Sequence, residues 1–188
     1  MTAALAPNPA LATLVADLDD VARHASPSAT VDAVAAALRP HLGRPDLLRP
    51  DQRVGDPTGY RQHLLHVAPD GAWSLVALVW LPGQATAVHD HVTWCVVGVH
   101  AGSEHETRYR LVGPSAEGPA PGDGVLVEDG TLVSGPGSVV GLLPPGDIHR
   151  VENSGHGTAI SLHVYGADLR LRTTSIRRRY DLPVRARR

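Results

Sequence analysis

Between residues 60 and 165 the sequence alternates apolar and polar side chains with a period of two, and Gly or Pro interrupts the pattern every few residues. A period of two is typical of β-strands, because successive side chains of a strand point to opposite faces of a sheet. The interruptions, such as Pro82-Gly83 and Pro144-Pro145-Gly146, predict tight turns. The pattern predicts strands at residues 60–67, 73–80, 86–91, 94–101, 105–111, 124–133, 138–142, 148–153 and 158–165. So many short strands at close spacing indicate an all-β sandwich or a small barrel.

The N-terminal part has a period of three to four residues, which is typical of amphipathic helices. We expect helices at residues 9–25 and 29–42, the second ended by Gly43. A helical pair that precedes a set of strands is expected to pack outside the barrel. The expected organisation is a helical segment at 1–43, a barrel at 44–180 and a basic tail at 181–188.

Two further stretches stand out by composition. Residues 113–124 are rich in Gly and Pro and predict a surface loop. The C-terminal stretch from Arg170 onward is rich in arginine. It predicts a solvated tail or a surface between copies of the chain, and an anion contact is the alternative.

Charge and hydropathy exclude several functions. The formal net charge is −2, which gives the chain no electrostatic reason to bind nucleic acid. No apolar run approaches the ~18 residues of a membrane span. The single cysteine, Cys95, cannot form an internal disulfide, which suits a reducing compartment. Because the first residues lack a basic region, we expect a soluble cytoplasmic protein, either a monomer or a homodimer.

Histidines mark the expected site. His89 and His91 are separated by one residue, so on a strand both imidazoles point to the same side, as two ligands of one metal ion would. They belong to the segment Gly83-x5-His89-x-His91, and a second segment reads Pro144-x-Gly146-x2-His149-x3-Asn153. The alternative is that these histidines are buried structural residues.

The two segments resemble the paired motifs of the cupin superfamily, which implies a small β-barrel of the jelly-roll type. Cupins usually carry a Glu three or four residues after the second His, where this chain has Cys95. Glu104 and Glu106 come too late, beyond the turn at Gly102. The implied ligand set is therefore three neutral imidazoles, from His89, His91 and His149. Such a set leaves a divalent ion its full charge and open positions, which suits Fe(II) better than a closed zinc site.

One predicted strand carries polar side chains at every second position. In a barrel interior they must be hydrogen-bonded, so they form a plausible relay, whereas the alternative is an outward, solvated face. The polar residues are Ser161, His163 and Tyr165, and they alternate with Ile160, Leu162 and Val164.

Together these features resemble the thiol dioxygenases, namely cysteine dioxygenase and its bacterial relatives that act on 3-mercaptopropionate. The resemblance covers roughly residues 58–166. It implies Fe(II) bound by the three histidines, and addition of both atoms of O₂ to the sulfur of a small thiol acid to give a sulfinate. It also implies that Ser161, His163 and Tyr165 form an outer-sphere group.

The resemblance also implies substrate contacts. Gln62 matches the position at which the cysteine-specific type carries a carboxylate-binding Arg, and the neighbouring Arg61 would point to the other face. A Gln favours 3-mercaptopropionate, with L-cysteine next. The mercaptopropionate type uses an Arg after the last Tyr, for which Arg170 and Arg172 are candidates, and Arg172 is our choice. Cys95 lies near the position at which cysteine dioxygenases carry a cysteine that can crosslink to the active-site Tyr. The resemblance therefore suggests a thioether between Cys95 and Tyr165, and a small buried core thiol is the alternative.

Two other functions remain open. A three-histidine cupin can cleave carbon–carbon bonds in a diketone or flavonol, which requires a larger, more apolar pocket and no line of Ser, His and Tyr. A non-catalytic cupin would bind a small ligand for sensing or storage.

Overall fold

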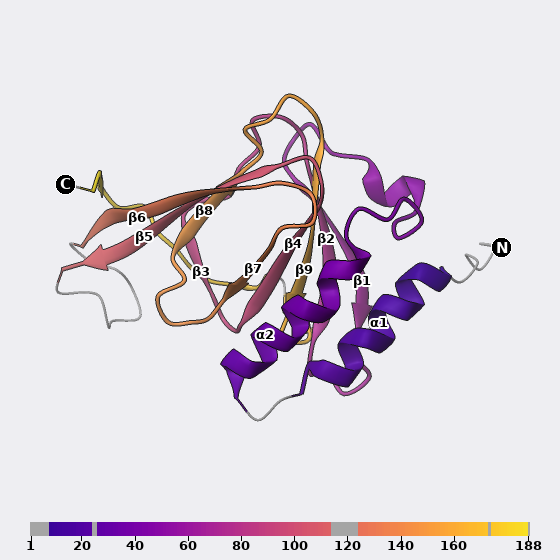
Figure 1. Ribbon diagram of the computed structural model, residues 1–188. Coiled ribbons are helices and arrows are strands. Elements are labelled where there is room, and N and C mark those ends of the chain that lie inside the picture. Colours follow the sequence, from indigo (N-terminus) through magenta and orange to yellow (C-terminus); the bar gives the residue numbers. More distant parts are fainter. Residues whose placement is uncertain (1–7, 24–25, 114–123, 173, 188) are drawn as a thin grey trace.

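The computed structural model describes residues 8–23, 26–113, 124–172 and 174–187, and strands predominate in it. All the strands β1 to β11 of the described residues belong to two sheets that face each other as the walls of a barrel (Figure 1). From edge to edge, the first sheet contains β1 (Arg61–Val67), β2 (Ser74–Trp80), β9 (Ala159–Tyr165), β4 (Cys95–Ala101) and β7 (Val139–Leu142). The second contains β10 (Ile176–Arg179), β3 (His89–His91), β8 (His149–Glu152), β5 (Glu104–Val112), β6 (Val125–Ser134) and β11 (Val184–Arg185).

The predicted strands are confirmed, mostly to within a residue at each end. The exception is β3, which is only three residues long where the sequence predicted 86–91. Two strands were not predicted. β10 pairs antiparallel with β3, and β11, inside the expected basic tail, pairs in parallel with β6. The division of the chain into a helical segment, a barrel and a tail, with boundaries after residues 43 and 180, stays a prediction. Residues 114–123 of the expected loop lie outside the described residues.

Both predicted helices are present, with shifted ends. α1 (Pro9–Val21) begins at Asn8, whose side chain accepts a hydrogen bond from the backbone N–H of Leu11. α2 (Pro27–Leu38) starts two residues earlier than predicted, because Ser26 caps it and Pro27 fits its first turn. Its last expected turn is a 3₁₀ helix, η1 (Arg39–His41), and a second one, η2 (Pro50–Arg53), lies in the expected loop region.

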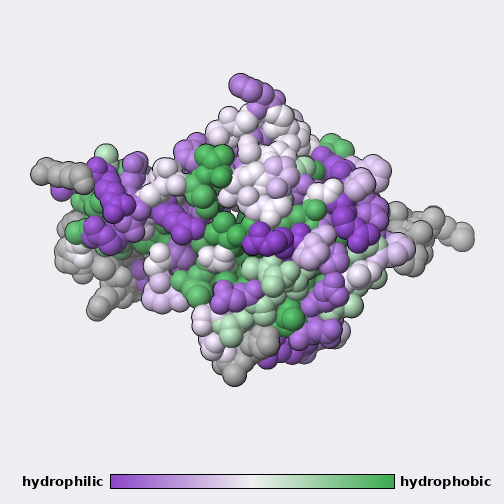
Figure 2. All heavy atoms as spheres, viewed as in Figure 1, coloured by the Kyte–Doolittle hydropathy of each residue, from purple (hydrophilic) through white to green (hydrophobic). Residues whose placement is uncertain are grey.

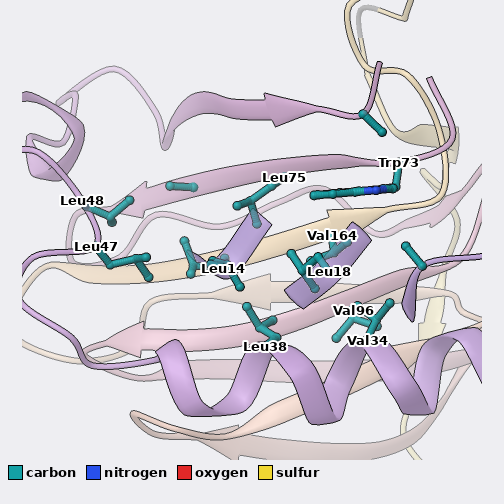
Figure 3. Close-up of a cluster of buried hydrophobic side chains, with 14 of the residues drawn as sticks. Leu14, Leu18, Val34, Leu38, Leu47, Leu48, Trp73, Leu75, Val96 and Val164 are labelled. Carbon is teal, nitrogen blue, oxygen red and sulfur yellow. The ribbon is translucent and has the colours of Figure 1, made fainter. Parts of the chain in front are cut away.

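The helices cover the outer face of the five-stranded sheet (Figure 1). Leu14 and Leu18 of α1 and Val34 and Leu38 of α2 point at the sheet, and all four are fully buried (Figure 3). Burying such side chains stabilises the fold by roughly 1.5–3 kcal/mol each. The sheet meets them with Trp73, Leu75, Val96, Ile160, Leu162 and Val164.

Two glycines let α2 approach closely. A Cβ atom on Gly98 of β4 would lie 2.9 Å from atoms of Leu38 and Leu42, and one on Gly141 of β7 would lie 2.3 Å from Val31. Any larger residue would push the helix outward. The sheet is therefore covered on its outer face, and its inner face is free to form the site.

Hydrophobic side chains also gather near the centre of the face seen in Figure 2, while hydrophilic residues cover much of its remainder. In the described part of the chain, no helix has the length and apolar character needed to cross a membrane.

Candidate metal and substrate site

Three histidines meet inside the barrel. β3 supplies His89 and His91, and the neighbouring strand β8 supplies His149, which is paired directly with His89. All three side chains are buried, and one ring nitrogen of each lies within 4.8 Å of the others. The two sequence segments are thus brought together by one strand pairing.

Each histidine has an outer hydrogen-bond partner on Nδ1. His89 uses the carbonyl oxygen of Ala87 at 3.0 Å, His91 uses Asp147 at 2.9 Å, and His149 uses Glu106 at 2.8 Å. An oxygen acceptor fixes the proton on Nδ1 and leaves the lone pair of Nε2 available. The arrangement orients three Nε2 atoms toward one point.

The electrostatics support neutral imidazoles paired with ionised carboxylates. Burial, together with a smaller effect of the neighbouring His149 and His91, lowers the pKa of His89 to about 3. Burial raises the pKa of Asp147 and of Glu106, but hydrogen bonds from His91 and His149, respectively, outweigh this and hold both below their usual values. His89 and His149 are therefore neutral near neutral pH, since burial lowers the pKa of both, and the two carboxylates act from behind the three histidines.

The residues fit a divalent metal ion. The Nε2 atoms of His89 and His149 are 3.3 Å apart. Two nitrogens that each lie ~2.0–2.1 Å from one ion are separated by about this distance. When each of these two rings carries its proton on Nδ1, the lone pairs of the two Nε2 atoms face and repel each other. A cation bound between them would remove that repulsion.

The Ser-His-Tyr line, which we define as Ser161, His163 and Tyr165, faces these histidines from β9. Ser161 Oγ lies 2.9 Å from His163 Nε2, and Tyr165 Oη lies 3.1 Å from His163 Nδ1. The ring centroids of Tyr165 and His91 are 6.0 Å apart. The alternating residues Ile160, Leu162 and Val164 pack against the helices, so both faces of β9 are buried.

Burial controls the protonation of this line. Burial, together with a smaller effect of the nearby histidines, lowers the pKa of His163 to about 3. It raises the pKa of Tyr165 well above its usual value, as does the adjacent Cys95, while a hydrogen bond with Ser175 acts in the opposite direction. Near neutral pH, His163 is therefore neutral and Tyr165 is a phenol.

A cavity joins the three histidines to His163 and Tyr165. Gln62, Tyr60 and Thr86 also line it, and Thr174 and Ser175 close it from the segment before β10. Arg61, the neighbour of Gln62, instead forms an ion pair with Asp56. Cys95 is completely buried and lies opposite Tyr165 in the sheet.

No arginine among the described residues lines this cavity. Arg170 is held by Asp168 through several hydrogen bonds, and Arg172 is exposed. The structure does not bring Arg172 to the other residues of the site, so its role as a carboxylate anchor stays a prediction.

Four contacts of the site were missed by sequence reasoning. Asp147 stands two residues before His149, a spacing that would have been a usable signal. Glu106 and Trp80 gave no local signal, because strand pairing brings them to the site from far along the chain. Ser175, in the segment before β10, belongs to no pattern that the sequence shows.

The barrel and its buried histidines define a metal-binding cupin. The cysteine dioxygenase type I family matches residues 2–175, and the chain belongs to this family of oxidoreductases. Its fold and three-histidine site are those of a non-haem metal thiol dioxygenase.

Solved structures of low sequence identity resemble the chain. One, from Thermus thermophilus, is 20% identical, with a TM-score of 0.44 over 64% of this chain and 96% of the other. A cupin superfamily protein from Desulfitobacterium hafniense is 12% identical, with a TM-score of 0.45 over 68% and 90%. A double-stranded β-helix protein from Klebsiella pneumoniae is 17% identical, with a TM-score of 0.46 over 64% and 84%.

Proposed function

We propose that the protein is an iron(II)-dependent thiol dioxygenase that converts a small thiol acid and O₂ into a sulfinate. 3-Mercaptopropionate is the favoured substrate and L-cysteine the next. The observation that carries the proposal is the set of three buried histidines with no carboxylate among them. An ion held by this set keeps its 2+ charge and open positions, so it can bring a thiolate and dioxygen together.

The protein side chains supply orientation and a proton donor. The rings of Tyr165 and His91 lie 6.0 Å apart between centroids, and a hydrogen bond with His163 fixes the phenol. The raised pKa of Tyr165 keeps that proton in place, so the phenol can donate a hydrogen bond to the thiolate or to oxygen. Gln62 lines the same cavity and can hydrogen-bond a substrate carboxylate.

The charges of the cavity support a thiol acid without an amine. Among the described residues, none of those that line it is an aspartate or glutamate, so the ammonium group of cysteine or cysteamine would find no counter-charge there. Within the lining of the cavity, the carboxylate of a thiol acid would meet only neutral donors. Arg172 is retained as a proposed second contact for this carboxylate.

The test is oxygen consumption by the iron-loaded protein. We expect the Fe(II) protein, mixed with 3-mercaptopropionate without air and then exposed to it, to take up one O₂ for each sulfinate formed. His149→Ala should abolish uptake, and His156→Ala, which removes an exposed histidine, should not.

Two outcomes would contradict the proposal. Absence of uptake with 3-mercaptopropionate, cysteine, cysteamine and mercaptosuccinate would leave a ligand-binding cupin. Uptake with a diketone or a flavonol alone would identify an enzyme that cleaves carbon–carbon bonds.

A further inference from the structure

The side chain between the two histidines of β3 lies on the opposite face of the strand, because successive side chains alternate. This residue, Asp90, is nevertheless almost completely buried. Its carboxylate oxygen Oδ2 accepts two hydrogen bonds from the guanidinium of Arg177 and one, at 2.9 Å, from the hydroxyl of Tyr180. Its other oxygen meets no donor in the described part of the chain, so these two side chains hold the carboxylate. We call Asp90, Arg177 and Tyr180 the outer clamp.

Both partners of Asp90 come from the C-terminal part of the chain. β10 is the edge strand of the six-stranded sheet and pairs antiparallel with β3. The register shifts between Ile176 and Arg178, so Arg177 is the extra residue of a bulge, a feature that re-aims a side chain. Tyr180 follows the strand and packs into a hydrophobic cluster on the outer face of the sheet. The outer clamp therefore fastens β10 to β3 and to the sheet beside it.

β3 depends on β10 for most of its pairing. Among the described residues, β3 pairs with β8 at a single position, His89 with His149. With β10, each of its residues has a partner. His91, which has no partner in β8, lies opposite Ile176, and Ile176 itself lines the metal cavity. The position of His91 is therefore set from the edge of the sheet as well as by Asp147.

The ion pair of the outer clamp is better suited to fixing register than to adding stability. Burial of the Asp90 carboxylate costs much of what its attraction to Arg177 returns, whereas a buried charge pair can specify how two elements align. A slip of β10 by one residue would turn its side chains to the opposite face. Arg177 would then leave Asp90, and Ile176 would leave the cavity. The outer clamp allows one register only.

We propose that the outer clamp positions the metal-binding strand: Asp90, Arg177 and Tyr180 hold β10 in register against β3, and β10 holds His91 at the metal. The three are positioning residues, since none of them lines the metal cavity. The match to the family ends at residue 175, so Arg177 and Tyr180 lie beyond it. The proposal concerns metal binding alone and holds whichever reaction the site carries out.

Thermodynamic linkage provides a test that requires no catalysis. If the docked β10 raises the affinity of the site for a metal ion, the bound ion must stabilise the docked β10 by the same factor. We therefore expect Zn²⁺ to slow backbone amide hydrogen exchange at residues 176–180 of the full chain, measured by mass spectrometry. β6, which is not adjacent to β3, is the internal reference and should change much less.

Two variants break the outer clamp to different extents. Arg177→Met removes the charge and keeps the length of the side chain, whereas Tyr180→Phe removes only a hydroxyl group. Arg177→Met should weaken Zn²⁺ binding by roughly 10-fold and Tyr180→Phe by less, and both should reduce the protection of β10 by the metal. The matched control is Arg179→Met, because Arg179 is exposed on the same strand and has no ion pair with the described residues. It should bind Zn²⁺ like the wild type.

Co²⁺ in place of Zn²⁺ separates positioning from stability, because its visible absorption depends on the geometry of its ligands. Arg177→Met should alter this spectrum, since His91 moves, whereas a loss of stability alone would leave the spectrum of the folded protein unchanged. The milder Tyr180→Phe answers the same question if Arg177→Met folds poorly. Amide exchange of β10 that does not respond to Zn²⁺, or clamp variants that bind Zn²⁺ as tightly as the wild type, would overturn the proposal.

Discussion

Asp147 accepts two hydrogen bonds from His91 through a single oxygen atom, one from Nδ1 at 2.9 Å and one from the backbone N–H at 3.1 Å. The carboxylate therefore fixes the strand, the ring orientation and the tautomer of His91 together. Both groups are almost completely buried, so water does not compete for these bonds.

Asp147→Asn should weaken metal binding by roughly 10- to 100-fold, because the isosteric amide keeps the shape but loses the charge that holds the Nδ1 proton. Titration of the metal-free protein with Fe(II) under anaerobic conditions measures the change. The control is Glu152→Gln, which alters a more exposed ion pair with His105. Equal affinities of wild type and Asp147→Asn would mean that the carboxylate does not tune the ligand.

Gln62→Arg should shift the preference of the enzyme toward L-cysteine. A guanidinium can form a charge-assisted pair with a carboxylate, worth ~1.5–3 kcal/mol, so the ratio of kcat/KM for cysteine to that for 3-mercaptopropionate should rise by ~10-fold or more. Arg61→Gln is the control, because Arg61 pairs with Asp56 away from the cavity. An unchanged ratio in Gln62→Arg would count against Gln62 as the substrate anchor.

The sequence was sufficient to predict most of the strands, because alternation and turn residues are local signals. The period of a strand alone was enough to predict that His89 and His91 point to the same side. His149 was predicted from a second segment with fixed spacing. The helix ends were less certain, since caps such as Ser26 compete with the hydrophobic pattern. β10 and β11 lie in an arginine-rich stretch without alternation, so nothing local marks them as strands.

The contacts behind the site could not be predicted for a different reason. Glu106 reaches His149 because β5 pairs with β8, and Glu104, on the same strand, lines a cavity beside His149. Strand order and register decide both contacts, and a single sequence does not determine either. Sequence reasoning excluded these two glutamates as metal ligands, and it had no means of finding the positions they occupy behind the site.

Cys95 should remain a free thiol. It is buried opposite Tyr165, and burial raises the pKa of its thiol well above the usual value, so the reactive thiolate is scarce. The intact mass of protein purified in air with iron should equal that of the sequence. A mass lower by two hydrogens, absent from Cys95→Ala, would instead show a thioether between Cys95 and Tyr165.

The stability of the metal-free protein should fall as the pH drops below about 6.5. The pKa of His163 is about 3 in the folded state, against a usual value of 6.5, so between these limits the unfolded chain binds more protons. The contribution of His163 is complete above pH 6.5 and is lost progressively as the pH falls toward 3. Its slope is at most ~1.4 kcal/mol per pH unit.

His163→Gln removes this titration and should flatten the pH dependence of the free energy of unfolding by up to that slope, measured by urea denaturation from about pH 7 downward. The variant has its own cost at every pH, since Gln cannot reproduce both hydrogen bonds of the ring to Ser161 and Tyr165. The test therefore compares the slopes of the two plots of unfolding free energy against pH, and not the absolute values of the free energy. His156→Gln, the same change at an exposed site, should keep the wild-type slope. If His163→Gln and wild type lose stability in parallel, His163 is not held neutral in the folded protein.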